Sequence, residues 1–351
     1  MIKMNITKTP EFSWSCSRSQ IFNTCRRSYW YQYYGGHNGW LDNPDITAHT
    51  IYKYRNVTNF NLVVGQGIHE VMKKAVTFKD DDYSGQDVKK WMKNYLHEAC
   101  VKGSNMAAWD SKPNRNPMLQ EFLYWGGFKS DKSQKVIDYV NKKLDNFGEM
   151  FKTTTTYQEI KAGRMKELIE ADENMNNNNK YGSEILTFTN KHGQELSVKI
   201  WAKIDLLYIR DDGKYIITDW KTESKDAFVK EDSNDDAYFQ LLVYAWYVLK
   251  KYHVSLKNII LRRENVVTGT TFESTAPSLA TVSKALQRIT TEVDAMSEYV
   301  VDKDIANNVS HAKESYGMIS EDGHCSQCEK CKFRALCFGL DSTVAPAENI
   351  A

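Results

Sequence analysis

Hydrophobic spacing divides the chain into a helical first part and a strand-rich second part. Helical spacing, with apolar residues every three or four positions, predicts helices at 11–34, 65–78, 86–101, 132–152, 236–250 and 279–301. β-prone apolar runs predict strands at 185–189, 196–202 and 257–266. Residues 35–60 and 103–117 are predicted to be irregular, and 173–180 is an asparagine-rich, low-complexity segment. The pattern predicts an α/β chain in which a helical region precedes a meander of strands.

A hairpin between Ile204 and Lys221 is the best-defined element of the second part. Two apolar runs flank Asp212-Gly213, a pair that favours a tight turn because glycine accepts positive φ without steric cost. Folding the chain there brings Asp205 and Asp219 almost opposite each other on adjacent strands. A two-residue loop leaves them one position out of register, and a three-residue loop with a bulge aligns them. Because side chains alternate along a strand, Lys221 lies on the same face as Asp219.

Two carboxylates and an ammonium therefore converge near a sheet edge. Hard oxygen ligands for a divalent cation, with a positive group near the scissile phosphate, are what a metal-dependent phosphodiesterase requires. The alternative is a surface turn with ordinary charges at its ends. The apolar run at 215–217 favours the enclosed setting, because charges beside a buried strand are costly without a cation or a partner.

Cysteines form the second notable pattern. Four of the chain's seven lie close together, at Cys325, Cys328, Cys331 and Cys337. Such crowding argues against a disulfide framework and for a metal site in a reducing, cytoplasmic compartment. Tetrahedral zinc and an iron–sulfur cluster both use thiolates, and spacing alone does not separate them. If zinc takes all four, Cys25 is spare.

Charge and composition narrow the function classes. The 351 residues are 41% hydrophobic and 26% charged, as in an ordinary soluble protein, and carry a net charge of +1. That balance excludes a globally basic DNA-coating protein, so any nucleic-acid surface is local. Arg26 and Arg27 follow Cys25 amid aromatic residues and offer a phosphate-contacting edge, or simply a packing helix. No apolar run reaches membrane-spanning length, and no secretory signal is evident at the N-terminus.

Six short motifs together resemble RecB-like nucleases of the PD-(D/E)XK superfamily, in the branch with an iron–sulfur cluster. That branch includes CRISPR-associated adaptation nucleases, AddB-type helicase–nucleases and exonuclease V. The motifs occur in family order and span nearly the whole chain. They are the cysteine helix at 17–27, Gly65-x-x-x-His69, Ile204-Asp205, Asp219-x-Lys221, Gln240-x-x-x-Tyr244 and Cys328-x2-Cys331-x5-Cys337. The chain departs from the family at Trp201-Ala202-Lys203, where a small residue is usual, and at the additional Cys325.

The resemblance implies a restriction-endonuclease-like αβα core with a mixed central sheet. It implies a single domain over 1–351, with a helical insertion at about 80–182, a catalytic core at about 183–305 and an iron–sulfur-stapled segment at 321–340. His69, Asp205, Asp219 and the carbonyl of Trp220 would hold Mg²⁺ or Mn²⁺. Lys221 would act on the water or the transition-state charge, with Gln240 and Tyr244 positioning it. Cys25, Cys328, Cys331 and Cys337 would bind a [4Fe–4S] cluster, with Cys325 as the alternative ligand and Zn²⁺ as the alternative metal.

Three functions follow as hypotheses. The first is a metal-dependent exonuclease or end-processing nuclease acting on single-stranded or unwound DNA in recombination, repair, replication or CRISPR adaptation. For it the resemblance implies a helicase, recombination or CRISPR partner. Arg18, Arg26 and Arg27 are its predicted DNA contacts. The second is a non-catalytic DNA-binding or partner-docking subunit, which the intact Asp205, Asp219 and Lys221 disfavour. The third is a zinc-stabilised sequence-specific endonuclease, which the distant Cys25 disfavours.

Overall fold

The computed structural model describes residues 12–77, 85–171, 182–223, 229–299 and 315–339. The chain forms two compact units, and the low-complexity segment predicted at 173–180 lies outside the described residues. Unit 1 comprises Met1–Asn59, Cys100–Ser133 and Glu292–Ala351, and unit 2 comprises Phe60–Ala99 and Gln134–Thr291. The predicted cysteine-rich segments therefore both fall in unit 1, whereas the predicted catalytic residues all fall in unit 2. That the chain acts as a single domain stays a prediction.

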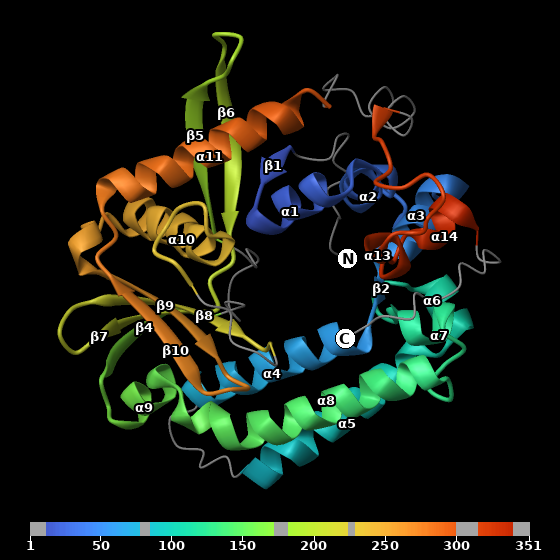
Figure 1. The fold of residues 1–351 in the computed structure, drawn as a ribbon, viewed down its shortest axis with the longest axis horizontal. Helices are drawn as coiled ribbons and strands as arrows, with labels where there is room; N and C mark the ends of the chain where they lie inside the picture. Colours follow the sequence, from blue (N-terminus) through green and yellow to red (C-terminus); the bar gives the residue numbers. More distant parts are fainter. Residues whose placement is uncertain (1–11, 78–84, 172–181, 224–228, 300–314, 340–351) are drawn as a thin grey trace. The chain divides into compact units, whose positions relative to one another are not determined.

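A five-stranded mixed sheet is the centre of unit 2 (Figure 1). Its strands are ordered β10 (Thr270–Thr275), β9 (Ile259–Asn265), β8 (Tyr215–Lys221), β7 (Leu206–Arg210) and β4 (Met165–Ala171). β8 and β9 are parallel, and the other neighbours are antiparallel. The parallel pair requires a crossover, which α10 (Asp236–Tyr252) supplies. A mixed sheet with helices agrees with the predicted PD-(D/E)XK fold class; β4 and β10 were not predicted.

The hairpin between β7 and β8 has the three-residue loop that aligns the two aspartates. Ile209 pairs with Tyr215, and the Arg210 N–H donates to the Lys214 carbonyl at 2.8 Å, leaving 211–213 as the loop. Gly213 has φ of 79°, the left-handed conformation that this loop needs at its last position. At the other end Leu206 pairs with Thr218, so the next positions outward are Asp205 and Asp219.

The two faces of the sheet have different covers. Side chains alternate along β8, so Asp219 and Lys221 face one side, and Thr218 and Trp220 the other. Helix α10 lies on the Lys221 side, where it contributes Gln240. The short helix α9 (Thr155–Lys161) lies on the Thr218 side, where Thr156 contacts Thr218. Between them β7, β8 and α10 are fully buried along most of their length, and this burial forms the core of unit 2.

The remaining elements of unit 2 largely match the predicted pattern. Helices α4 (Phe60–Thr77), α5 (Gly85–Gly103), α8 (Asp131–Met150) and α11 (Leu279–Ser297) extend or shorten the predicted helices by a few residues, and α5, α8 and α11 run across the unit boundaries. Strands β5 (Gly182–Thr189) and β6 (Glu195–Ala202) pair as an antiparallel hairpin. The 3₁₀ turns η2 (Phe151–Thr153) and η3 (Leu256–Asn258) precede α9 and β9.

Unit 1 corrects three predictions. The single helix predicted at 11–34 is β1 (Ser13–Trp14), α1 (Cys16–Thr24), α2 (Arg26–Trp30) and the π-helix η1 (Tyr31–Gly35). Its break is at Cys25, whose extended backbone (φ −156°, ψ 114°) ends one helix and begins the next. The serine cap is correct, because Ser15 Oγ accepts from the Arg18 N–H at 3.1 Å.

The segments predicted to be irregular also contain helices. Helix α3 (Ile46–Arg55), capped by Asp45, lies within 35–60, and α6 (Met106–Ser111), capped by Asn105, lies within 103–117. Short capped helices are easily missed because their hydrophobic periodicity covers few turns. The unit is completed by α7 (Gln120–Tyr124), α13 (Ser326–Glu329) and α14 (Arg334–Phe338), and by the short parallel pair β2 (Val57–Thr58) and β3 (Met118–Leu119).

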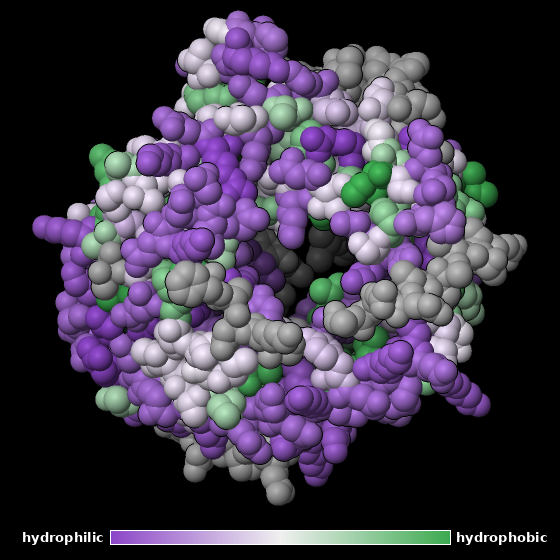
Figure 2. Space-filling model, viewed as in Figure 1, coloured by the Kyte–Doolittle hydropathy of each residue, from purple (hydrophilic) through white to green (hydrophobic). Residues whose placement is uncertain are grey.

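Hydrophilic residues cover most of the face shown in Figure 2, and hydrophobic residues appear there in small separate areas. Exposed large hydrophobic side chains include Ile46 and Leu279. Among the described residues no helix is both long and apolar enough to cross a membrane.

Candidate functional site

Two buried aspartates lie where β7 and β8 meet at their ends. Asp205 and Asp219 are 6% and 3% exposed. Asp205 immediately precedes β7, and its Oδ2 accepts a hydrogen bond from the Trp220 N–H at 2.8 Å. The backbone of one strand thus holds the carboxylate of the other, and both acids are brought together as the sequence predicted.

Helix α4 brings His69 to the same place. Its Nδ1 lies 3.3 Å from Asp205 Oδ1, and its ring meets the Trp220 indole edge to face. Gly65 lies one turn earlier on the helix, and a Cβ there would lie 3.5 Å from Thr222 Oγ1. The Gly65-x-x-x-His69 motif therefore presents its glycine to the residue after Lys221 and its imidazole to Asp205.

Lys221 links Asp219 to helix α10. Its Nζ lies 2.9 Å from Asp219 Oδ2 and donates to Gln240 Oε1 at 3.2 Å. The Gln240 Nε2 in turn donates to the Tyr244 hydroxyl at 2.7 Å. Gln240 and Tyr244 are four residues apart on one helix face, so the helix sets their spacing. The chain Tyr244–Gln240–Lys221–Asp219 restricts the ammonium to the vicinity of the acids.

Burial and mutual charge shift the two carboxyl groups in opposite directions. Burial raises the pKa of Asp219, and the Asp205 charge adds to this, so the pKa of Asp219 is raised despite Lys221. Burial also acts to raise the pKa of Asp205. There the interactions with His69, Lys221 and the Trp220 N–H outweigh burial, and the pKa is lowered. Burial acts to lower the pKa of Lys221, but the two carboxylates outweigh it and the net shift is upward.

The donor set suits a hard divalent cation. Two buried carboxylates close enough for Asp205 to raise the pKa of Asp219 repel each other, and a cation would relieve that repulsion. In the described geometry Lys221 offsets part of this charge, and the His69 Nδ1 lies beside Asp205. Among the described residues no three His, Cys, Asp or Glu side chains are arranged around one point to hold an ion. Lys221 contacts Asp219 through Oδ2, and a carboxylate has a second oxygen to offer an ion.

A second feature, in unit 1, is a cavity of about 300 Å³ lined by cysteines from both ends of the chain. Cys25, Cys328 and Cys331 line it, together with the apolar side chains of Ile21 and Phe333. Cys337 lies nearby, because it interacts electrostatically with Cys331 and Tyr31. The tertiary fold therefore brings Cys25 to the C-terminal thiols.

Cys325 has a different role from the thiols that line the cavity. Its Sγ accepts a hydrogen bond from the Cys328 N–H at 3.3 Å and so caps helix α13. Burial raises the pKa of Cys328 to about 12 and that of Cys331 to about 11, and neighbouring thiols add to both shifts. Buried, mutually repelling thiols need a cation to become thiolates.

The three predicted DNA-contacting arginines have distinct surroundings. Arg27 Nε donates to the Tyr316 carbonyl at 2.9 Å, so it ties α2 to the C-terminal segment. The Arg26 guanidinium lies over the Phe22 ring, 3.4 Å from its centroid. Arg18 lies over Tyr33 at 4.1 Å and donates to the Ser13 carbonyl. Their role in DNA binding stays a prediction.

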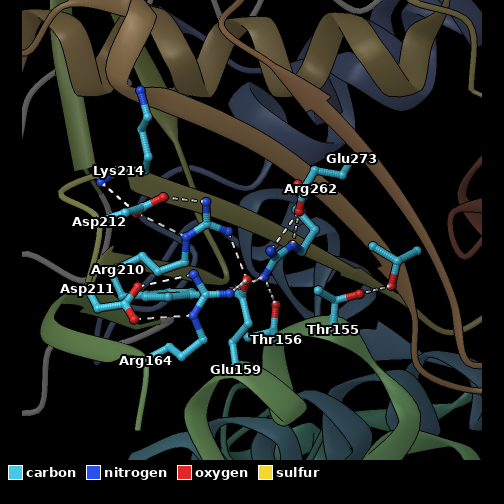
Figure 3. A network of polar contacts seen from close by, with 12 residues as sticks. Thr155, Thr156, Glu159, Arg164, Arg210, Asp211, Asp212, Lys214, Arg262 and Glu273 are labelled. Carbon is cyan, nitrogen blue, oxygen red and sulfur yellow. Dashed lines mark hydrogen bonds and ion pairs between the residues drawn. The ribbon is translucent and has the colours of Figure 1, made fainter. Parts of the chain in front are cut away.

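The prediction did not include the charged residues of β9. Arg262 and Glu264 are fully buried on the α9 side of the sheet. Glu264 accepts from the Trp220 Nε1 at 3.3 Å and from the Thr156 N–H at 2.7 Å. Arg262 lies in a network with Glu159 and Glu273 (Figure 3). The sequence did contain a signal for this network, since Arg262-Arg263-Glu264 interrupts an otherwise apolar run. Charges in the core of a strand require partners.

A comparison with known protein families identifies the superfamily of this chain. The PD-(D/E)XK nuclease superfamily matches residues 13–338. The chain belongs to this superfamily. As a PD-(D/E)XK protein it is a nuclease by family, and divalent metals such as Mg²⁺ are typical of that superfamily. No curated protein matches the chain.

Proposed function

We propose that this PD-(D/E)XK protein is a Mg²⁺- or Mn²⁺-dependent deoxyribonuclease whose active site is the end of the β7–β8 hairpin. The observation that carries the proposal is the register of the hairpin, which places two buried carboxylates beside each other with Lys221 on the face of Asp219. Negative charge of this kind is costly unless a cation occupies the site.

Asp205, Asp219, His69 and the Trp220 carbonyl would hold the metal. When bound, it would lower the pKa of a coordinated water and offset charge on the phosphate. The Trp220 N–H fixes Asp205, and the Lys221 contact with Gln240 keeps the ammonium oriented toward the acids. Lys221 then places a positive charge where negative charge develops on the phosphate in the transition state. Gln240 and Tyr244 act on Lys221 and are positioning residues.

The resemblance to the RecB-like, iron–sulfur branch extends the proposal to the substrate. We infer an exonuclease or end-processing activity on single-stranded or unwound DNA, with a helicase, recombination or CRISPR-adaptation protein as partner. A non-catalytic DNA-binding subunit is the competing function. The contacts of Lys221 with Asp219 and Gln240 favour an enzyme, since a purely binding subunit has no need of an oriented ammonium beside two acids.

The cleavage experiment uses anaerobically purified protein, end-labelled single- and double-stranded DNA and a single-stranded circle, with and without Mn²⁺. We expect metal-dependent cleavage that Asp205→Ala, Asp219→Ala and Lys221→Ala each abolish. Asp211→Ala, at the exposed tip of the same hairpin, is the matched control and should cleave normally. Intact circles would support an exonuclease. Wild-type protein that leaves every substrate uncut, yet binds DNA, would favour the non-catalytic subunit.

For unit 1 we propose a [4Fe–4S] cluster on Cys25, Cys328, Cys331 and Cys337. A four-iron cluster is larger than one ion, so its thiolates surround a cavity, as three of these do. A zinc knuckle on Cys325, Cys328, Cys331 and Cys337 needs no remote ligand and is the competing metal site. Cys325 is engaged in capping α13 and would be spare.

One pair of substitutions distinguishes the iron–sulfur cluster from a zinc site. Cys25→Ser should remove visible absorption and bound iron from anaerobically purified protein, whereas Cys325→Ser should retain both. With a zinc knuckle the wild type should be colourless, and Cys325→Ser rather than Cys25→Ser should lose the bound metal. Colourless, zinc-loaded protein that is indifferent to Cys25→Ser would overturn the cluster.

A further inference from the structure

Arg263 is a second cation beside the candidate active site, and the mechanism above does not use it. β8 and β9 are parallel with Asp219 paired to Arg263, and residues paired in this way point to the same face of the sheet. The Arg263 side chain is only 11% exposed. It interacts electrostatically with both Asp219 and Lys221, so its charge reaches the catalytic group.

Glu223 is the carboxylate that engages this guanidinium. Its Oε1 lies 3.0 Å from Arg263 Nη2, and its side chain is 49% exposed. The backbone at Glu223 is fixed separately, because its carbonyl accepts from Asn265 Nδ2 at 3.0 Å. The carboxylate can therefore leave Arg263 for solvent while the strand end stays in place.

A third charged group, Lys143 of α8, interacts with the same carboxylate. Lys143 is 4% exposed, and its Nζ donates to the neutral Asn61 Oδ1 at 2.9 Å. Burial lowers the pKa of Lys143 to about 8, and Glu223 opposes this shift. With Lys143 protonated, Arg263, Lys143 and Glu223 carry a net charge of +1. Arg263 is thus the cation in contact with the half-exposed Glu223, and Lys143 adds positive charge that acts on the same carboxylate.

We propose that Arg263 forms a binding site for a non-scissile phosphate of the DNA strand, and that Glu223 occupies this site until DNA displaces it. The inference rests on the proposed nuclease function and names part of its substrate site. A phosphate oxygen offers the guanidinium the same charge-assisted hydrogen bonds as the Glu223 carboxylate. Since Arg263 lies beside Asp219 on the neighbouring strand, the bound phosphate would be a neighbour of the one that is cleaved.

The two members of the ion pair should therefore have opposite effects on DNA binding. Arg263→Gln should weaken binding of a fluorescein-labelled single-stranded oligonucleotide by about tenfold or more, because it removes charge-assisted hydrogen bonds. It should also reduce the slope of log affinity against log salt by about 0.7, the value for one phosphate contact on a single strand. Glu223→Gln should strengthen binding and leave that slope unchanged. Lys143→Gln should weaken binding.

Binding is measured with Ca²⁺ in place of Mg²⁺, and thermal unfolding of each variant is recorded alongside. The matched control is the exposed Lys89–Asp145 ion pair of α5 and α8, whose Lys89→Gln and Asp145→Asn variants should bind as the wild type does. If the Arg263–Glu223 pair merely braces the sheet, both of its variants should change binding in the same direction or not at all. Either result would overturn the proposal, and Glu223→Gln keeps it testable should Arg263→Gln fail to fold.

Cleavage of the same oligonucleotide with Mn²⁺ separates this inference from the proposed function. Opposite binding effects in a wild-type protein that does not cleave would retain the phosphate site and reject the nuclease. A wild-type protein that cleaves, with Arg263→Gln and Glu223→Gln indistinguishable in binding, would retain the nuclease and reject the phosphate site.

Discussion

Replacing Arg262 with methionine tests whether the polar network on the α9 side of the five-stranded sheet stabilises unit 2. The guanidinium is fully buried and donates to Glu159, Glu273, Thr156 and Tyr208 (Figure 3). Methionine has a similar length but no hydrogen-bond donor, so the change keeps much of the packing and deletes the charge. Thr218, the partner of Arg262 on β8, immediately precedes Asp219.

The expected loss follows from what the substitution leaves buried. Burial acts to raise the pKa of Glu159, but bonds from Arg262, Tyr208 and Arg210 outweigh it and hold that pKa below its usual value. Removing one partner from a buried ion pair costs about 3–5 kcal/mol. Arg210 remains 2.8 Å from Glu159 Oε1, which places the loss near the lower end, at about 3 kcal/mol. For a domain of 150–250 residues that corresponds to a fall in melting temperature of about 6–12 °C.

Urea unfolding followed by circular dichroism measures the effect. Arg164→Met is the matched control, because Arg164 is 40% exposed and pairs with Asp211 at the surface, with only a longer contact of 3.4 Å to Glu159 Oε1. We expect it to unfold at the wild-type urea concentration. If Arg262→Met also unfolds there, the buried ion pairs do not stabilise the sheet, and the reasoning from burial is wrong.

Three further outcomes concern the hairpin. Burial and Asp205 raise the pKa of Asp219, so protons compete with the metal as the pH falls toward that pKa. The Mn²⁺ concentration for half-maximal cleavage should therefore rise at acid pH, and excess Mn²⁺ should restore the rate. Equal metal requirements across the pH range would show that Asp219 is not a ligand. Without metal, the raised pKa makes the contribution of Asp219 to stability fall as the pH rises above about 3.9, the pKa of an aspartate in the unfolded chain. Melting curves at several pH values, with and without Mn²⁺, would detect this fall. Gly213→Ala forces an alanine to φ of 79° at the loop and should cost about 1 kcal/mol in urea unfolding while leaving the Asp205–Asp219 register, and hence cleavage, intact; loss of cleavage would show that the loop also sets the active site.

Local patterns in the sequence predicted many of the helices and strands of this structure. Alternation and turn chemistry predicted the β7–β8 hairpin, and helical spacing predicted α4, α5, α8, α10 and α11, because these signals act over a few neighbouring residues. Asp205, Asp219 and Lys221 were found from the hairpin pattern, whereas His69, Gln240 and Tyr244 were assigned by the family resemblance. The structure brings all six to one strand end.

Tertiary structure decided what no local pattern contains. The choice between a two- and a three-residue loop, and with it the alignment of Asp205 with Asp219, is fixed by pairing along the whole hairpin. The break at Cys25 follows no periodicity, and it falls where Cys25 lines a cavity with Cys328 and Cys331. Arg262 and Arg263 are consecutive in the sequence, yet strand alternation sends one into a buried network and the other to the face of Asp219. Only the packing of α9 and the pairing with β8 reveal which is which.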